Sequence, residues 1–320
     1  MQLNLPILEH LAESENILIA GAGGGFDVFA GLPIYFTLRE RGKNVHLANY
    51  SFTDLGVAQL LGETETLIAG QLIGARGNVR RPAPYYPEGF LAQWFREVRG
   101  ENVTVWMFDK TGAAPLAAAY AQLIEHLQID ALILTDGGVD SIMRGDEQAP
   151  GTLLEDSITL AAVSELTLPV KLLACLGFGT EVEEMVGHHH ALENIAALAK
   201  AGAYRGACAL TPQMPVFQQF EAAARYVWEQ PGHHKSHITT RVIPAVHGEF
   251  GDHHMYDYTS EVFISPLMSL YWFFDAAGVI ERSLLAGPLR HTNSVREALR
   301  TYHHVVKHID VRPRRAIPYF

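Results

Sequence analysis

The pattern that decides the fold is ENILIAGAGGGFDVFAGLPIYFTLRERG, residues 15–42. Its first part is a short apolar run that ends in glycines, which predicts a buried strand followed by a tight turn. From residue 26 the apolar residues recur with helical spacing as far as Gly42, and a glycine is typical of a helix end. A strand, a glycine turn and a helix in this order are the first unit expected of a parallel α/β sheet.

The same alternation continues along the chain. Strand patterns recur at 44–52, 102–109, 129–136 and 169–179, and most of them are separated by helical patterns. Strands that alternate with helices predict a mostly parallel sheet whose two faces are covered by the connecting helices. We therefore expect an α/β fold with a doubly wound, Rossmann-like sheet.

The last third of the chain has a different pattern. HITTRVIPAVHG, residues 237–248, has the composition of a strand, whereas the apolar stretch 262–280 predicts a buried helix. Pro266 and Asp275 interrupt that stretch, and a membrane span needs about 20 largely uncharged apolar residues. The sequence contains no repeat and no linker. We therefore expect residues 1–320 to form a single domain, with helical and strand-like additions from about 211 to 320 and a helical C-terminal extension.

Composition argues against several classes of protein. The 35 acidic residues outnumber the 24 basic ones, which gives a net charge of -11. Nucleic acid is therefore not expected as a partner, because phosphate binding needs a surplus of Lys and Arg. Cys175 and Cys208 lie in apolar surroundings, as expected in a reducing compartment without disulfides. The first residues lack the basic region of a secretory signal. We expect a cytoplasmic protein with a small-molecule substrate and no membrane partner.

The glycine-rich turn is the first candidate ligand site. Gly21, Gly23, Gly24 and Gly25 follow the first strand, where open parallel sheets often hold a pyrophosphate against backbone N–H groups. A dinucleotide such as NAD(P) is thus one possible cofactor. A turn that serves only to pack the helix against the sheet is the alternative.

Three residues depart from the dinucleotide-binding pattern. Phe26 stands in the place of the third glycine, and Asn49 stands where an acidic residue would bind the ribose. Asp27 begins the helix, where its carboxylate would repel a phosphate beside it.

Acidic side chains follow several predicted strands at their carboxyl ends. The candidates at these ends are Asp109, Asp136, Gly137, Gly138, Asp140 and Glu181. Open parallel sheets bind ligands at this edge, at the point where the strand order reverses. If the first and fourth strands are neighbours there, Asp27 and Asp136 face each other across the crevice.

Carboxylates of the same charge cannot be crowded together unless another group offsets them. That group could be Mg²⁺ or Ca²⁺ bound by Asp136 and Asp140, sugar hydroxyls, or a cationic part of a substrate. Glu155 and Asp156 lie in the first turn of the next helix, where acidic residues are favoured without any function.

Histidines gather after the segment 237–248, in HGEFGDHH at 247–254. We expect His247 to follow a strand and to project toward the crevice as a general acid or base. Glu249 is a further candidate for substrate binding. No HExxH or CxxC motif accompanies these histidines, so a zinc site is not expected.

TDGGVDS, residues 135–141, resembles the DTDPGxDD run of nucleoside hydrolases, in which aspartates bind Ca²⁺ and ribose. Asp136, Gly138 and Asp140 keep its spacing, while Gly137 replaces the proline and Ser141 the last aspartate. The same residues resemble the core of the pyrophosphatase loop SGGxDS, which holds ATP phosphates. The first glycine turn is similar to the GAG and GIPxFR pattern of sirtuins, with two additional residues between the two parts.

Over most of its length, the sequence is similar to an uncharacterised domain-of-unknown-function family of archaeal and bacterial proteins. The similarity rests on ILIAGAGGGFDVFAGLPIYF, TDGGVDSIMRGDE, GTLLEDS and HITTRVIPAVHGEFGD. It implies a shared fold and carries no activity, so function is predicted here from chemistry.

Three functional hypotheses follow. In the first, an enzyme binds a nucleoside- or nucleotide-like substrate at the acidic strand ends and acts as a hydrolase or transferase at a ribosyl carbon, because paired carboxylates stabilise an oxocarbenium ion and activate water. Asp136 and Asp140 then bind the cation or hydroxyls, Asp27 is a second ligand or base, and His247 protonates the leaving group. The second is a Rossmann-type NAD(P)-dependent oxidoreductase. The third is a non-catalytic metabolite sensor or assembly subunit, in which 262–280 forms a homo-oligomer interface.

Overall fold

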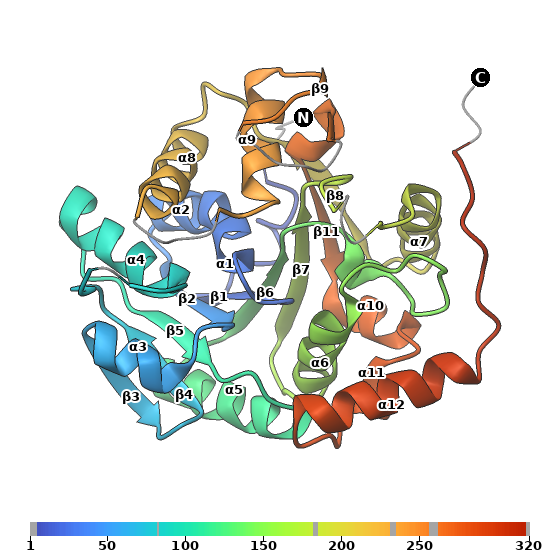
Figure 1. The fold of residues 1–320 in the computed structure, drawn as a ribbon, viewed down its shortest axis with the longest axis horizontal. Coiled ribbons are helices and arrows are strands. Elements are labelled where there is room, and N and C mark those ends of the chain that lie inside the picture. The colour runs from blue at the N-terminus through green and yellow to red at the C-terminus, as the bar shows by residue number, and fades with distance from the viewer. Residues whose placement is uncertain (1–4, 82, 182–184, 231–234, 256–261, 318–320) are drawn as a thin grey trace.

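The computed structural model of the chain describes residues 5–81, 83–181, 185–230, 235–255 and 262–317. Within these residues, nine strands form one sheet in the order β3-β4-β5-β2-β1-β6-β7-β11-β8. Its five central strands are parallel: β5 (Val105–Phe108), β2 (Asn44–Tyr50), β1 (Asn16–Gly21), β6 (Ala131–Asp136) and β7 (Val170–Leu176). This parallel centre with its connecting helices confirms the predicted α/β, Rossmann-like fold class (Figure 1).

The edges of the sheet are antiparallel. On one side, β4 (Leu72–Ala75) pairs with β5, and β3 (Thr64–Ile68) pairs with β4. On the other side, β11 (Leu270–Asp275) is inserted between β7 and β8 (Tyr204–Ala209) and runs antiparallel to both. A separate pair of short strands, β9 (Gly251–Asp252) and β10 (Phe263–Ile264), lies outside this sheet.

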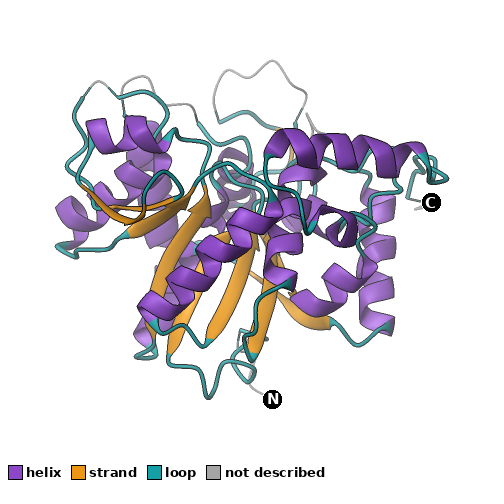
Figure 2. Ribbon diagram, turned by 90° about the horizontal axis from the view of Figure 1, so that it is seen from below, coloured by secondary structure: helices purple, strands orange, loops and turns teal. Residues whose placement is uncertain are grey.

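Helices cover both faces of the sheet (Figure 2). One face is covered by α1 (Asp27–Ala30), α2 (Leu32–Glu40), α3 (Leu55–Leu61), α4 (Pro87–Trp94) with the π-helical turn Phe95–Arg99, α8 (Pro215–Trp228) and α9 (Thr239–His247). The other is covered by α5 (Ala113–Leu127), α6 (Leu153–Ser164), α7 (His188–Lys200), α10 (Ala276–Arg282), α11 (Ala286–Leu289) and α12 (Val295–Lys307). Short 3₁₀ turns lie at Asp140–Ile142 and Pro266–Ser269.

The strand side chains alternate between the two cores that these helices complete. Ile17 and Ile19 of β1 belong to one buried cluster, whereas Leu18 and Ala20 belong to the other. This two-residue period is that of a strand covered on both faces, which explains why the strands are continuously apolar in sequence. The central strands are thereby fixed from both sides.

Two predictions for the last third of the chain are wrong. Residues 237–248 were expected to form a strand, but 239–247 form helix α9, whose Val242, Ile243 and Val246 pack into the core. Packing of this apolar face overrides the strand preference of its β-branched residues. The apolar stretch 262–280 forms β10, a 3₁₀ turn, β11 and most of α10 rather than one helix. A strand buried on both faces has the same continuous apolar pattern as a buried helix.

The helix expected at 26–42 is divided into α1 and α2 at Gly31. A side chain at this glycine would lie 2.4 Å from the Ile19 side chain, so the glycine allows the helix start to approach β1 closely. No helix in the described part of the chain is sufficiently long and apolar to cross a membrane.

The central position of β6 in the sheet can be tested by replacing a leucine with alanine in β6 and, for comparison, on the protein surface. Leu132→Ala empties a fully buried site in β6 and is expected to lower the free energy of unfolding by about 2–5 kcal/mol. Leu60→Ala, at a residue that is 73% exposed on α3, is expected to change it by less than about 0.5 kcal/mol. Urea unfolding followed by circular dichroism measures both, and equal losses would contradict the fold.

Candidate functional site at the switch point

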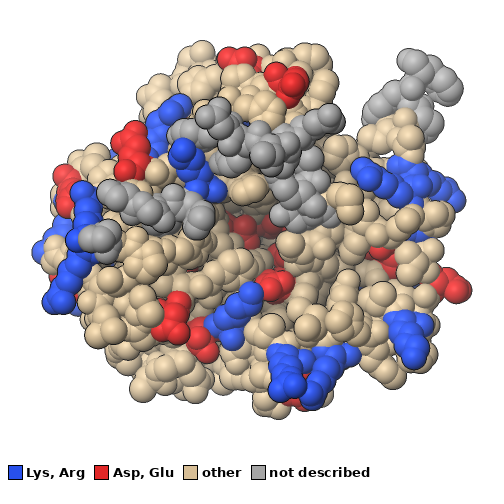
Figure 3. Space-filling model, in the orientation of Figure 1, with Lys and Arg blue, Asp and Glu red and all other residues tan. Residues whose placement is uncertain are grey.

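A cavity of about 1050 Å³ lies at the carboxyl ends of β1, β6 and β7. The strand order reverses between β1 and β6, because the chain continues from β1 to β2 on one side and from β6 to β7 on the other. This is the place where open parallel sheets bind ligands. Figure 3 shows acidic side chains inside the hollow at the centre of this face.

The glycine turn after β1 holds a carboxylate of its own chain. The backbone N–H of Gly23 donates to Oδ2 of Asp27 (2.7 Å), and the N–H of Gly137, from the turn after β6, donates to Oδ1 (3.2 Å). Gly24 and Gly25 have φ angles of +98° and +59°, a conformation that favours glycine. The Asp27 side chain therefore takes the position at the N–H groups where a phosphate would bind in a dinucleotide site.

Asn49, near the end of β2, stabilises this turn by hydrogen bonding. Its amide donates to the carbonyl of Gly25 (2.9 Å) and to Oε1 of Glu88 (2.8 Å). Glu88, in the first turn of α4, is completely buried, and burial raises the pKa of its carboxyl group. Glu88 was not a candidate from the sequence, because it lies in RRPAPYYPEG, residues 80–89, whose three prolines predict only a loop.

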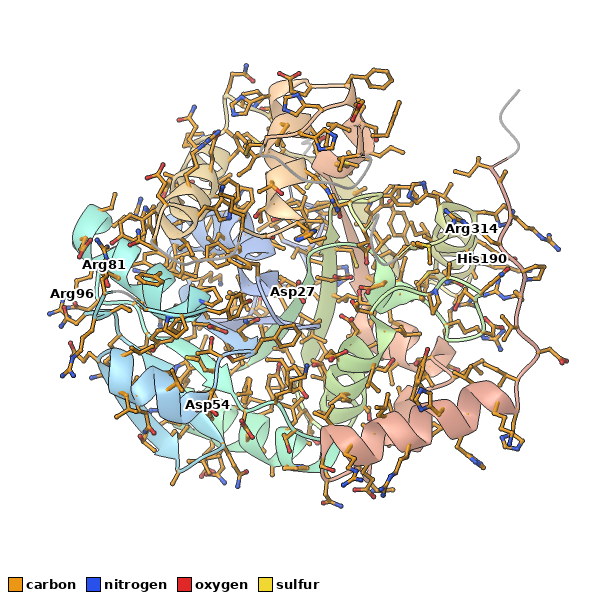
Figure 4. All side chains as sticks on the ribbon, viewed as in Figure 1. Asp27, Asp54, Arg81, Arg96, His190 and Arg314 are labelled. Atoms are coloured by element: carbon orange, nitrogen blue, oxygen red, sulfur yellow. The ribbon has the colours of Figure 1, made fainter. Side chains whose placement is uncertain are left out.

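Three carboxylates converge beside the turn. One oxygen each of Asp27, Asp136 and Asp156 lies within 4.8 Å of the other two. Asp136 ends β6 and accepts hydrogen bonds on Oδ2 from the backbone N–H (3.2 Å) and the hydroxyl of Ser141. Asp156 comes from the first turn of α6, and its Oδ1 is buried without a hydrogen-bond partner among the described residues. Figure 4 shows Asp27 near the centre of the molecule.

Asp140 and Glu181 form a second acidic pair on the cavity wall. Oδ2 of Asp140 accepts from the backbone N–H (2.7 Å) and the hydroxyl (2.8 Å) of Thr152. Oε2 of Glu181 accepts from the N–H of Val139 (2.7 Å), and burial and then the charge of Asp140 raise the pKa of this carboxyl group. Two neighbouring carboxyl groups with raised pKa values are favoured in the state in which they hold one proton between them.

Burial raises the pKa of the acids that form the floor of the cavity, which are Asp27, Asp136, Asp140, Asp156 and Glu181. The pKa of Asp27 is raised to about 7 by burial and then by the charge of Asp140. For Asp136, Asp156 and Glu181, burial and the neighbouring carboxylates raise the pKa well above its usual range. Such shifts are typical of functional sites, since acids in purely structural positions are usually hydrated or paired with a base.

Glycines allow these carboxylates to approach the backbone. A Cβ atom at Gly23 would lie 2.8 and 2.9 Å from the two carboxylate oxygens of Asp156. A Cβ atom at Gly138 would lie 2.4 Å from the carboxyl carbon of Glu181, and one at Gly151 would lie 2.5 Å from Cβ of Asp140. These glycines therefore make room for acids that come from distant parts of the sequence.

Aromatic side chains line another part of the cavity. Phe26 and Tyr85 make an edge-to-face contact with ring centroids 5.9 Å apart, and Phe52 lies nearby with 45% of its surface exposed. Nζ of Lys110 is 4.2 Å from the centre of the Phe52 ring and 2.9 Å from Glu155. The cavity thus combines an acidic floor with flat apolar surfaces.

The structure does not bring His247 to the cavity. It is the last residue of α9, its Nε2 lies 2.9 Å from Glu221, and its side chain is 43% exposed. Because 239–247 is a helix instead of a strand, the beginning of this segment faces the cavity, and His237 lines it. Glu249 pairs with His253 and also lies outside the cavity.

Some of the other predicted site residues line the cavity, and the rest lie outside its lining. Lining residues from the prediction are Gly23, Gly24, Gly25, Asp27, Asp136, Gly137, Asp140 and Glu181. Gly21 and Gly138 lie behind that surface, and Asp109 is outside the lining although the next residue, Lys110, is part of it. Asp156, interpreted from sequence as an ordinary helix-start acid, belongs to the central cluster.

The remaining acids of the stretch 131–147 form ion pairs with Arg312. Nη2 of Arg312 lies 2.7 Å from Asp146 and 2.8 Å from Glu147, and its carbonyl accepts from the N–H of Gln148 (3.0 Å). These contacts fix the loop between Asp140 and α6 to a segment that follows α12 (Figure 1).

The fold and site define a Rossmann-like α/β protein with an acid-lined cavity at the switch point of its sheet. Residues 18–309 match a family described as "Protein of unknown function (DUF1152)". The match covers most of the chain, so the chain belongs to this family, which confirms the resemblance seen in the sequence. Searches of the curated proteins and of the solved structures gave no match.

The raised pKa values predict how the stability of the metal-free protein depends on pH. The folded protein keeps a proton on Asp27 up to about pH 7, whereas the unfolded chain releases it near 3.8. The stability from this proton is complete below the lower value and is lost as the pH rises through the higher one. We therefore expect the melting temperature in a chelator to fall as the pH rises from about 4 to about 7. The pKa of Asp156 is also raised, by burial and by the neighbouring carboxylates, so Asp156→Asn removes one such contribution and calorimetry should show a smaller fall. Identical slopes would contradict the raised pKa of Asp156.

Gly23→Ala tests the close approach of Asp156 and Asp27 to the glycine turn. The added methyl group displaces both carboxylates, and we expect it to lower the free energy of unfolding by about 1–3 kcal/mol. The matched control is Gly287→Ala on α11, where nothing lies within 4 Å of the new Cβ atom. Urea unfolding should show this control unchanged or stabilised. A Gly23→Ala variant as stable as the control would rule out the crowding.

Proposed function

We propose that the protein is an enzyme that binds a nucleoside- or nucleotide-like substrate in the switch-point cavity and cleaves or transfers it at the ribosyl carbon. The single observation that carries this proposal is the combination, in one cavity, of convergent buried carboxyl groups and exposed aromatic rings. Each part matches one half of such a substrate.

The acidic floor suits the sugar. Asp27, Asp136 and Asp156 are acceptors held at fixed positions by β1, β6 and α6, and sugar hydroxyls are donors that satisfy such acceptors. The aromatic part, with Phe26 and Phe52, offers faces on which a planar base can stack. A volume of about 1050 Å³ is large enough for both halves of a nucleotide.

The reaction that fits these groups is substitution at the carbon that carries the base. The carbon–nitrogen bond breaks with its electron pair leaving on the base, and the negative charge of Asp27, whose pKa is about 7, stabilises the oxocarbenium-like transition state. Water, or another acceptor hydroxyl, forms the new carbon–oxygen bond. The Asp140–Glu181 pair gives its shared proton to the departing nitrogen and takes the proton of the attacking hydroxyl, so that it returns to its initial state.

The geometry supports an NAD(P)-dependent oxidoreductase less well. The N–H groups of Gly23 and Gly137 already donate to Asp27, and Asn49 binds the turn and Glu88. A pyrophosphate at this turn would have to displace a carboxylate. A metabolite sensor with the same cavity would bind the ligand without turnover, and the experiment below separates these alternatives.

A panel of purine and pyrimidine nucleosides and their 5′-monophosphates tests the proposal. The full-length protein is incubated with each compound, with and without Ca²⁺ or Mg²⁺, and free base is measured by chromatography. We expect release of base from at least one class, and a reduction in kcat of at least about 100-fold in Asp136→Asn.

Asp54→Asn is the matched control. Asp54 caps α3 away from the cavity, as Figure 4 shows, and asparagine caps a helix equally well, so activity should be unchanged. Binding without release of base in any reaction would favour the sensor, and binding of NAD(H) or NADP(H) alone would favour the oxidoreductase. Either result would overturn the proposed reaction.

A further inference from the structure

We propose that Asp27, Asp136 and Asp156 form a binding site for one hard divalent cation, Ca²⁺ or Mg²⁺. The site lies in the cavity assigned above to the substrate, but it does not require the proposed reaction to be correct. It also differs from the pair expected from sequence, because Asp156 takes the place of Asp140, whose Oδ2 accepts hydrogen bonds from the backbone N–H and the hydroxyl of Thr152.

The spacing of the three oxygens suits a single ion. Two oxygens bound to one ion are separated by at most twice the metal–oxygen distance, which is about 4.6–5.2 Å for Ca²⁺ and about 4.0–4.2 Å for Mg²⁺. The oxygens of Asp27, Asp136 and Asp156 lie within 4.8 Å of one another. This spacing is compatible with Ca²⁺ after at most a small inward movement of the three carboxylates, and the shorter bonds of Mg²⁺ require a larger one.

Asp156 provides an independent observation that a ligand is expected here. The residue is 1% exposed, its carboxylate faces the cavity, and Oδ1 has no hydrogen-bond partner within the described residues. Buried polar atoms in proteins are almost always paired, and an ionised carboxylate without a partner is particularly costly. A cation between the three acids would supply the missing partner.

The other two ligands are already oriented. Both oxygens of Asp27 are held by glycine N–H groups, and Asp136 is held through Oδ2 by Ser141. Three protein oxygens fill only part of the six to eight positions of Ca²⁺, so the open side of the cavity leaves positions for water or substrate hydroxyls.

A second group of side chains is less suitable for a cation. His189, His190 and Glu193 on α7 also offer three atoms within 4.8 Å. However, Glu193 forms an ion pair with Arg312, whose positive charge would oppose a metal at this place.

Isothermal titration calorimetry tests the cation site directly. The full chain is treated with a chelator, dialysed, and titrated with CaCl₂ and, separately, MgCl₂ at pH 7.5. We expect one ion per chain and tighter binding of Ca²⁺ than of Mg²⁺. Asp156→Asn keeps the shape of the side chain but removes its charge, and it should weaken binding by at least about tenfold.

The neighbouring residue gives a matched control. Glu155 lines the same cavity from the same helix, but it pairs with Lys110. Glu155→Gln should weaken cation binding by less than about fivefold, as expected for a charge outside the ligand set. An equal loss in both variants would show that only the general negative potential attracts cations, and would overturn the site.

Absence of saturable binding of either ion to the wild-type protein would also overturn the proposal, and would mean that protons alone neutralise the acids. Thermal unfolding checks that each variant is folded. If Asp156→Asn does not fold, Asp136→Asn replaces it with the same expected loss. Cation binding without base release contradicts only the proposed reaction, whereas base release without cation binding contradicts only this site.

Discussion

The structure depends on holding several carboxyl groups of the same charge together at one buried point. Their mutual repulsion and their loss of water both oppose this arrangement. The protein offsets part of the cost with directed donors: N–H groups of Gly23 and Gly137 for Asp27, Ser141 for Asp136, and Thr152 for Asp140. The remaining cost is expressed as raised pKa values, and a proton or a positively charged ligand is needed to remove it.

The sheet makes this concentration of charge possible. In a parallel sheet all carboxyl ends lie at one edge, so the turns after β1, β6 and β7 meet although they are far apart in sequence. The strands that position these turns are packed on both faces by buried apolar side chains. The rigidity of the two cores therefore holds the carboxyl groups close together against their mutual repulsion.

The sequence predicted those features that depend on local periodicity. The predicted alternation of strands and helices is present in the fold. The candidates Asp27, Asp136, Asp140 and Glu181 line the cavity. Features decided by tertiary contacts were not predictable. Asp156 has the same position in its helix as any acid that favours an N-terminus, and only the fold turns it toward Asp27. The prediction placed His247 at the cavity because it took this segment for a strand. Packing against the core makes the segment a helix, and His247 lies at the end of α9 away from the cavity.

The ion pairs between Arg312 and the acids Asp146 and Glu147 join two segments separated by more than 160 positions in the chain. The conformation of the stretch from Gly137 to Asp156 consequently depends on a residue outside it. Transplanted into another sheet without Arg312, this stretch would keep the ion pair of Asp146 with Arg144, but Glu147 would lose its ion pair beside the loop that orients Asp140. We therefore expect relatives that differ at Asp146 or Glu147 to differ at Arg312 as well.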